Sequence, residues 1–315
     1  MSSLLFITST RIGDAVLSTG ALALARARVP DARVTIACGP LAAPLFRAEP
    51  GLAELIVMKK AKYGAHWIDL WRKLAGRRFD LAVDLRGSAV TYLIGARRRL
   101  VFHSRGEKGH KLDEFAALFG ACAAPEMNIA IDDKARADAD AFLGPPRRTL
   151  VLGASANWAG KVWSRENFGA LARDLAGPSG PLAGALIVLL GGPEDRAALD
   201  ALAADLRAAG LDARSSAGEL DLLACAALLQ RCALFVGNDS GLMHLSGAMR
   251  APTLGLFGPT DERVYGPRGP RARAIRGPRS FEDVARAIVP RVEQVSLMGD
   301  LSVAAVAAAA REMLA

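Results

Sequence analysis

Short continuous apolar runs recur along the chain, and most are followed by a polar turn and a segment with helical spacing. The runs fall at residues 4–8, 34–38, 55–58, 81–84 and 100–102, and again at 150–153, 185–190, 233–237 and 253–257. Runs of this length without alternation are typical of strands buried on both faces, as in parallel sheets. Helical spacing covers residues 15–27, 165–175, 194–209, 220–230, 242–249 and 302–314. The alternation predicts an α/β protein built from βαβ units.

Residues 121–148 interrupt this alternation and end in the run Pro145-Pro146-Arg147-Arg148. Because consecutive prolines end helices and remove backbone donors, we expect the domain boundary here. The prediction is two doubly wound, Rossmann-like parallel-sheet domains, residues 1–145 and 146–315, that face a cleft. Ligands of such sheets bind outside the carboxyl ends of the strands, so polar residues directly after strands are the candidate site residues.

Composition narrows the class of protein. Of the 315 residues, 51% are hydrophobic and 23% are charged, which suits two folded domains rather than a disordered chain. The four cysteines lack metal-ligand spacing, and three lie in apolar stretches, as expected of buried free thiols in a reducing cytoplasm. The N-terminus lacks the pattern of a signal peptide, and no apolar run reaches the ~20 residues that span a bilayer. We expect a cytoplasmic protein whose membrane contact is peripheral, on the cytoplasmic face of the inner membrane.

The formal net charge of +8 favours an anionic partner. Positive charge is concentrated in one stretch, at Arg97, Arg98, Arg99, Arg105, Lys108 and Lys111. No recognition helix or Cys/His finger spacing accompanies it, so we favour an anionic small substrate or a lipid surface over nucleic acid. A patch that only keeps the protein soluble would explain the same residues equally well.

The most informative motif is Gly237-Asn238-Asp239-Ser240-Gly241-Leu242-Met243-His244, between a predicted strand and a predicted helix. Free amides at the start of a helix, together with the positive end of its dipole, bind anions. Ser240 and His244 are four residues apart and lie on the same side of the helix. An ordinary helix cap with a core histidine is the alternative interpretation of such a motif.

Three further motifs follow neighbouring strands, at residues 153–164, 191–195 and 257–261. Lys161 is a flexible cation suited to a diphosphate, and Glu194 can accept hydrogen bonds from ribose hydroxyls. Taken singly, a solvated lysine, an acidic helix start and a strand-ending turn would explain them. The predicted donor-binding residues are Gly153, Ser155, Lys161, Glu194, Asn238, Asp239, Ser240, Gly241, His244, Gly258 and Thr260.

The first strand-to-helix turn of the chain contains Arg11-Ile12-Gly13-Asp14. A carboxylate at this place can act as general base on an acceptor hydroxyl, although it can also simply cap the helix. The turn lacks the G-x-G-x-x-G pattern, which disfavours an NAD-dependent dehydrogenase. Asp138 and Asp140 form an Asp-x-Asp triplet in a polar helical stretch, which we interpret as a solvated face, so no metal site is predicted.

Together these motifs resemble glycosyltransferase family 9, the bacterial lipopolysaccharide heptosyltransferases, over nearly the whole chain. The similar segments are residues 7–14, 18–22, 80–87, 153–163, 236–245, 256–261 and 300–303. The segments 236–245 and 256–261 are the most specific, because both occur in order and one strand apart. Ser240 stands where threonine is common in the family, which keeps the hydroxyl.

The resemblance implies a GT-B fold, with an acceptor-binding N-terminal domain and a donor-binding C-terminal domain. It implies an inverting, metal-independent transfer without a cofactor, usually of heptose from ADP-L-glycero-D-manno-heptose to Kdo-bearing lipid A or inner core. Asp14 matches the proposed base of the family. The positions that contact the nucleotide diphosphate and ribose are matched by Lys161, Glu194, Asp239, Ser240, Gly241 and His244.

Transfer at an anomeric carbon passes through an oxocarbenium-like transition state, so the acceptor must lose a proton and the departing diphosphate must be stabilised. We expect Asp14 to meet the first need, and Lys161, with the Ser240 hydroxyl and the adjacent amides, to meet the second. The predicted acceptor-binding residues are Arg11, Gly13, Arg86, Arg97, Arg98 and Lys111. The alternatives are a GT-B transferase with another nucleotide sugar or a non-lipid acceptor, and a non-catalytic nucleotide-binding or assembly protein on the same fold.

Overall fold

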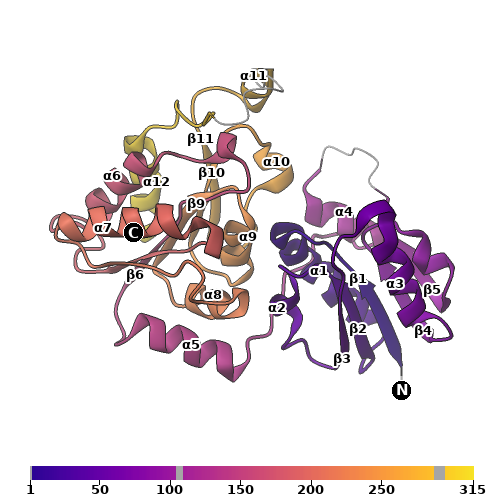
Figure 1. Cartoon of the computed structure of the whole chain (residues 1–315). Coiled ribbons are helices and arrows are strands. Elements are labelled where there is room, and N and C mark those ends of the chain that lie inside the picture. Colours follow the sequence, from indigo (N-terminus) through magenta and orange to yellow (C-terminus); the bar gives the residue numbers. More distant parts are fainter. Residues whose placement is uncertain (1, 104–108, 287–294) are drawn as a thin grey trace. The chain divides into compact units, whose positions relative to one another are not determined.

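The computed structural model describes residues 2–103, 109–286 and 295–315 (Figure 1). The chain folds into two compact units, Met1–Asp132 and Asp133–Ala315. The sequence placed the boundary later, at 145/146, and the difference is helix α5 (Asp133–Leu143). This helix packs against α8 (Leu222–Leu229) of the second unit, because Ala135, Ala139 and Leu143 give it one buried face.

The first unit contains a five-stranded parallel sheet in the order β3-β2-β1-β4-β5. Its strands are β1 (Ser3–Ile7), β2 (Arg33–Cys38), β3 (Leu52–Val57), β4 (Arg78–Asp84) and β5 (Gly95–Val101). Its α-helices are α1 (Ile12–Arg28), α2 (Ala43–Phe46), α3 (Ala65–Leu74) and α4 (Lys111–Leu118). Two 3-10 turns, η1 (Lys62–Gly64) and η2 (Ala89–Tyr92), precede α3 and β5.

The core of the first unit lies on both faces of this sheet, which explains why its central strand is apolar at consecutive positions. Residues 4–7 of β1 are completely buried. On one face, Leu70 and Leu74 of α3 pack with Leu5 and Ile7. Helices α1 and α4 pack against each other. As in other parallel sheets, burial on both faces requires apolar residues along the whole strand rather than alternation.

The second unit contains a six-stranded parallel sheet in the order β11-β10-β9-β6-β7-β8. Its strands are β6 (Thr149–Gly153), β7 (Leu186–Leu189), β8 (Ala213–Ser215), β9 (Leu234–Asn238), β10 (Thr253–Phe257) and β11 (Ala272–Arg276). Its further helices are α6 (Arg165–Ala176), α7 (Arg196–Ala208), α9 (Gly241–Ala248), α10 (Glu262–Tyr265), α11 (Phe281–Arg286) and α12 (Val303–Leu314). The 3-10 turns η3 (Ala159–Lys161) and η4 (Pro193–Asp195) follow β6 and β7.

Helices α6, α7 and α12 cover one face of the second sheet (Figure 1). Their apolar side chains share one core cluster with strands β6, β7, β9 and β10, in which Trp163 and Phe168 are the largest fully buried members. Helix α9 contacts β9 and β10, and α8 lies between α9 and α5. The sequence predicts one helix over residues 194–209, and the structure divides this stretch into η4 and α7.

The two sheets repeat one strand order. In the first unit the order reverses between β1 and β4, and in the second unit it reverses at the corresponding place, between β6 and β9. In doubly wound sheets, ligands bind beyond the carboxyl ends of the strands at this switch point. The loops after β1 and β4, and those after β6 and β9, are therefore the places where the fold favours a site.

Three strands differ most from the sequence prediction. Strand β5 begins at Gly95 and includes the arginine run, and β8 and β11 were not predicted. All three are at the edges of their sheets, where one side of the strand faces solvent. An edge position tolerates arginine, and none of these three strands is apolar throughout, so the pattern that identified the other strands does not apply to them.

Candidate functional site

Four adjacent strands of the second sheet, β7, β6, β9 and β10, lead into the four predicted donor motifs. The register places Gly153, at the end of β6, opposite Gly237 in β9. Parallel strands have their carboxyl ends at the same edge, so the loops with Glu194, Lys161, Asp239 and Thr260 start side by side. The sequence prediction that these motifs share one edge is consistent with this topology.

Asp239 joins three of these loops. Its Oδ2 accepts hydrogen bonds from Lys161 Nζ (2.6 Å) and from Thr260 Oγ1 (2.7 Å). His244 Nε2 lies 3.9 Å from the other carboxylate oxygen. The side chain of Asp239 is only 6% exposed and that of Lys161 is 18% exposed, so this ion pair is largely withdrawn from water. Such a pair fixes the position of the lysine ammonium before any ligand binds.

The start of α9 lies directly after Asp239. Ser240 has an extended backbone and occupies the N-cap position, and the helix runs from Gly241 to Ala248. Ser240 Oγ and Asn238 Nδ2 are both buried, and neither atom has a hydrogen-bond partner among the residues that the structure describes. Buried polar atoms are nearly always satisfied, so two such atoms beside free helix amides indicate a place for a polar ligand.

Trp163 anchors the loop that contains Lys161. This side chain is completely buried, its backbone N–H donates to Asn238 Oδ1 (3.0 Å), and its indole Nε1 donates to Leu301 O (2.8 Å). The segment before α12 adds two bonds, from Ser296 Oγ to Val162 O (2.6 Å) and from Leu297 N to Gly160 O (3.0 Å). The tryptophan is thus an anchor that positions the loop.

Arg276, at the end of β11, holds the next loop and was missed by the sequence analysis. Its guanidinium donates to the carbonyl oxygens of Gly258 and Thr260 and pairs with the carboxylate of Glu262. Its side chain is 11% exposed. Burial raises the pKa of Glu262, but the hydrogen bond and the charge of Arg276, together with a backbone hydrogen bond, outweigh it, so this pKa lies below its usual range. An arginine in a short edge strand gives no sequence signal of such a role.

The glycines of the motifs make room mainly for neighbouring side chains. A Cβ on Gly153 or on Gly237 would lie 2.7 Å from Cζ of Phe235, and one on Gly258 would collide with the sulfur of Met298. Packing against Phe235 therefore accounts for the glycine at position 237. Ser155 and Glu194 lie at the same strand edge, and no hydrogen bond joins either to Asp239 in the described part of the chain.

Asp14 is the third residue of α1, in the loop and helix start after β1 of the first unit. It is half-buried, and Ser9 Oγ lies 3.4 Å from its Oδ2. Ser9 Oγ also accepts from Arg11 N (3.2 Å), which shapes the turn. Arg11 is exposed and Gly13 is half-buried in the first turn of the helix. The Asp14 carboxylate therefore retains most of its capacity to accept hydrogen bonds.

Asp84, the last residue of β4, has the opposite environment. It is completely buried and accepts from Arg86 N (2.8 Å), Ser88 N (2.9 Å), Ser88 Oγ (2.5 Å) and Thr91 Oγ1 (2.7 Å). These bonds fix the loop after β4, which presents the exposed side chain of Arg86. Asp84 thus positions Arg86, a predicted acceptor residue. In the sequence, this role could have been inferred from the place of a carboxylate at the end of a buried strand.

The basic stretch is divided by its structure. Arg97, Arg98 and Arg99 are consecutive in β5, so Arg98 points to the opposite face of the sheet from the other two. Arg99 donates to the carbonyl oxygens of Thr91, Ile94 and Ala96. Lys111 pairs with Glu114 (2.6 Å), and its ammonium lies 4.2 Å from the ring centre of Phe102. The predicted residues Arg105 and Lys108 lie outside the described residues.

In the described ranges, no group of three or more His, Cys, Asp or Glu side chains could hold a metal ion. Asp138 of the Asp-x-Asp triplet pairs with Lys134, and Asp140 pairs with Arg231. Both carboxylates are on the solvated side of α5, as the sequence analysis expected. For the same ranges, no helix combines the length and the apolar character needed to cross a bilayer.

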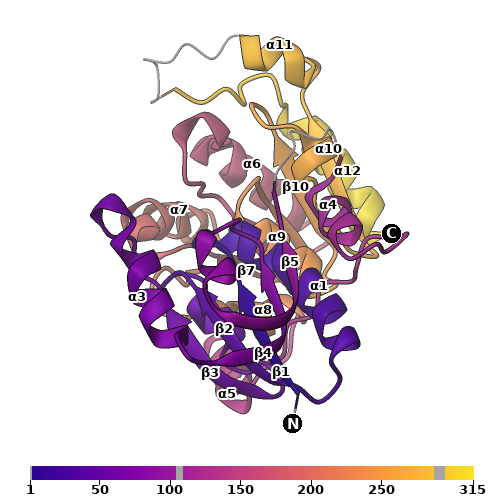
Figure 2. The ribbon, with the colours of Figure 1, turned by 90° about the vertical axis from the view of Figure 1, so that its right-hand side faces the viewer.

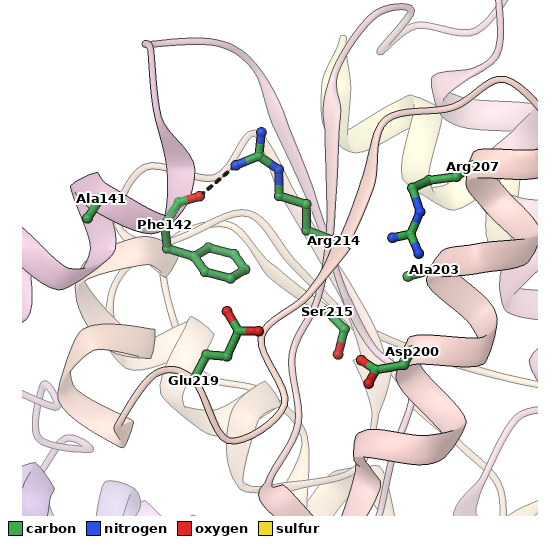
Figure 3. Close-up of a pocket in the computed structure, with 8 residues that line it drawn as sticks. All are labelled: Ala141, Phe142, Asp200, Ala203, Arg207, Arg214, Ser215 and Glu219. Atoms are coloured by element: carbon green, nitrogen blue, oxygen red, sulfur yellow. Dashed lines mark hydrogen bonds between the residues drawn. The ribbon is translucent and has the colours of Figure 1, made fainter.

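A separate pocket of about 570 Å³ lies at the free edge of β8, between α5 and α7 (Figure 3). It contains no predicted donor residue. Arg207 donates to Ala213 O (2.9 Å) and Arg214 to Phe142 O (2.9 Å), so both cations are engaged by backbone carbonyls. With Asp200 and Glu219 beside them, the charges are mixed, and the pocket has no net preference for an anion.

Comparison with known proteins agrees with the motifs and the fold. The family model described as glycosyltransferase family 9 (heptosyltransferase) matches residues 107–309. The chain is 26% identical to lipopolysaccharide heptosyltransferase 2 of Salmonella typhimurium, over 82% of this chain and 83% of the relative. It is 24% identical to lipopolysaccharide heptosyltransferase 3 of Escherichia coli, over 81% and 83%.

Solved structures show the same fold. ADP-heptose lps heptosyltransferase II of E. coli superposes with a TM-score of 0.78 and 21% identity, covering 99% of this chain and 98% of that one. A glycosyl transferase family 9 protein of Veillonella parvula superposes with a TM-score of 0.80 and 20% identity, covering 99% and 97%. The expected GT-B architecture of two Rossmann-like parallel-sheet domains is confirmed.

Proposed function

The chain belongs to glycosyltransferase family 9 and is therefore a glycosyltransferase, and we propose that it transfers heptose from ADP-heptose to the inner core of lipopolysaccharide. The proposal is supported by relatives that are named lipopolysaccharide heptosyltransferases. The observation that carries it is the Lys161–Asp239–Thr260 network beside the start of α9 at the switch point of the second sheet. This arrangement suits a nucleotide diphosphate.

The donor site would stabilise the leaving diphosphate without a metal ion. Lys161 supplies a positive charge that Asp239 holds in place, and the buried hydroxyl of Ser240 and the first amides of α9 supply neutral donors. Donors fixed before the reaction stabilise developing charge without reorganisation, which is the usual source of such catalysis. Glu194, after the adjacent strand β7, would accept from the ribose hydroxyls.

Asp14 would be the general base. In the reaction, the acceptor oxygen forms a bond to the anomeric carbon and its proton passes to the carboxylate. The bond from that carbon to the diphosphate oxygen breaks, and its electron pair stays on the diphosphate. Attack from the face opposite the leaving group inverts the anomeric configuration. Asp14 is the better candidate than Asp84, because Asp84 is buried and saturated by four hydrogen bonds.

The acceptor would bind to the first unit. Because the acceptor is a lipid-linked saccharide, binding would take place on the cytoplasmic side of the membrane surface. Arg11 and Arg86 lie after β1 and β4, at the switch point of that sheet, and both side chains are exposed. Arg97 and Arg98 are exposed on β5, and the ammonium of Lys111 is already paired with Glu114. We therefore expect Arg11 and Arg86 to contribute more to acceptor affinity than Lys111.

The test is transfer from ADP-heptose to a Kdo-lipid A acceptor in the presence of EDTA, followed by mass spectrometry. Asp14→Asn should lower kcat by about 10²–10⁴-fold while the affinity for ADP-heptose stays within about twofold. Arg136→Gln, on the exposed side of α5, is the matched control and should react like the wild type. ADP binding without turnover, or a donor panel in which another nucleotide sugar reacts and ADP-heptose does not, would contradict the proposal.

A further inference from the structure

Exposed large hydrophobic side chains are concentrated in the first unit. Within the described residues, seven of the eight such side chains belong to it, although it is the smaller unit. Five of them, which we call the aromatic face, are Tyr63, Ile68, Trp71, Tyr92 and Leu93. Single exposed apolar residues are common on soluble proteins, but a group of this size marks an interaction surface.

The aromatic face consists of two chain segments, residues 63–71 and 92–93, which come from elements that contact each other. Tyr63 lies in η1 directly before α3 and is completely exposed. Ile68 and Trp71 are three residues apart and therefore lie on the same side of α3, beside the stripe of Leu70 and Leu74 that faces the core. Turn η2, which contains Tyr92, contacts α3. Figure 2 shows α3 on the outside of the sheet of the first unit.

The aromatic face borders the predicted acceptor residues. Turn η1 and the start of α3 follow β3, and η2 follows β4, so both begin at the carboxyl edge of the first sheet. Asp14 and Arg86 follow β1 and β4 at the same edge. A surface that held the lipid part of an acceptor here would keep its sugar near these residues.

The charge around the aromatic face is strongly one-sided. The chain from residue 59 to residue 73 contains one acidic residue, Asp69, which lies 3.4 Å from Arg72. The cations of the same stretch are all exposed: Lys59, Lys60, Lys62, Arg72 and Lys73. Exposed Tyr and Trp together with lysines are typical of proteins that bind anionic membrane surfaces, where the rings enter the headgroup region. A hydrophobic protein partner would not require so many exposed cations at the border.

We propose that the aromatic face, with Lys59, Lys60 and Lys62, docks the protein on an anionic phospholipid bilayer. The docking rests on the proposed function, because it brings the enzyme to a lipid-linked acceptor. Helix α3 has ten residues and a length of about 15 Å, so it lies along the surface and does not cross it. The arginine run of β5 is less suited to this role, since Arg97 and Arg98 point to opposite faces of the sheet.

Vesicle flotation tests the docking in the absence of donor and acceptor. The full chain should float with vesicles that contain about 30% phosphatidylglycerol in phosphatidylcholine, and far less with phosphatidylcholine alone. Each lysine near an anionic surface contributes about 1 kcal/mol, or about fivefold, so Lys59→Gln, Lys60→Gln and Lys62→Gln combined should weaken partition about a hundredfold. Tyr63→Ser with Ile68→Ser removes on the order of 60 Å² of inserted apolar area and should weaken it about tenfold.

A charge-matched control separates docking from net charge. Lys134→Gln, Arg136→Gln and Arg286→Gln combined remove the same charge from exposed positions of the second unit and should leave flotation unchanged. We call the triple lysine variant and the Tyr63→Ser, Ile68→Ser variant the face variants. An equal loss of flotation in the control, or wild-type flotation of both face variants, would overturn the proposal. So would a dimer, measured by light scattering, that dissociates in Tyr63→Ser with Ile68→Ser, because it would identify a second copy as the occupant.

The transfer assay distinguishes failure of the docking from failure of the proposed function. With a deacylated, water-soluble acceptor, both face variants should react at the wild-type rate. With the acceptor embedded in anionic vesicles, they should lose activity in proportion to their loss of flotation. If the wild type reacts with the soluble acceptor but does not float, the docking is wrong and the function stands. If the wild type floats but transfers no heptose, the proposed function is wrong and the docking stands.

Discussion

The ion pair between Lys161 and Asp239 allows stability and catalysis to be separated. Lys161→Met removes the ammonium and leaves the Asp239 carboxylate, which is 6% exposed, with only the hydrogen bond from Thr260 and the nearby His244. Asp239→Asn combined with Lys161→Met removes both charges and keeps a side chain that can still bond Thr260. The single variant therefore contains an uncompensated buried charge, and the double variant does not.

The magnitudes follow from burial. Breaking a fully buried ion pair costs about 3–5 kcal/mol of stability, and since Lys161 is 18% exposed we expect about 2–4 kcal/mol for Lys161→Met. The double variant should recover to within about 1 kcal/mol of the wild type, because replacing both partners of a buried pair is often neutral. Transfer should behave differently. Loss of one fixed donor to a leaving group costs about 10²–10³-fold in kcat, and the double variant still lacks that donor.

Urea unfolding and initial rates of heptose transfer, measured on the same four proteins, check this reasoning. Wild type, the two single variants and the double variant form a complete cycle, which gives the coupling free energy between the two residues. We expect strong coupling in stability and almost none of the lost activity to return in the double variant. Recovery of transfer in the double variant would refute the role of Lys161 at the diphosphate. Equal stability of all four proteins would show that the pair is not buried in solution.

Two further predictions concern groups whose pKa is shifted. The pKa of Glu262 is lowered by Arg276 despite burial, so its stabilisation is present above the unfolded pKa of about 4.3 and is lost as the pH falls through the lower folded value. Arg276→Met should therefore cost about 1–3 kcal/mol at pH 7, and urea unfolding should show this difference shrinking below about pH 4. Burial raises the pKa of Cys38, Cys225 and Cys232 to about 12, so at pH 8 a thiol reagent should modify only the exposed Cys122 in the native protein and all four after unfolding.

The inner strands and main helices could be predicted from the sequence because burial on both faces leaves a direct pattern. The run at residues 4–8 corresponds to β1, and the run at 253–257 has the same bounds as β10. Strands β8 and β11 and the first part of β5 were not predicted, because these half-exposed edge strands lack an apolar run and two of them contain several arginines. Helix α5 was predicted only as a polar helical stretch, and its membership in the second unit depends on its contact with α8.

The partners within the site could not be predicted in the same way. The sequence places Lys161 and Asp239 after strands, but they are 78 residues apart, and only the sheet order brings the two loops together. The role of Arg276 depends on the reach of one side chain across two loops, and periodicity contains no information on that reach. The sequence likewise does not show that Trp163 anchors its loop, which follows from its complete burial and its hydrogen bond to Leu301 O.

The repeated strand order explains how two carboxylates at corresponding places serve different purposes. Asp84 ends β4 beside β1, and Asp239 follows β9 beside β6, so both lie at the switch point of their sheet. In the described part of the chain, the carboxylate of Asp84 accepts its hydrogen bonds from its own loop, between residues 86 and 91, and so fixes that loop. Asp239 instead receives them from the loops of β6 and β10, and one of its donors is a lysine. In the first arrangement no side-chain cation pairs with the carboxylate, whereas in the second the carboxylate holds a lysine ammonium at the strand edge. This difference favours the second unit as the donor side and leaves Asp14 as the carboxylate of the first unit that can still accept a proton.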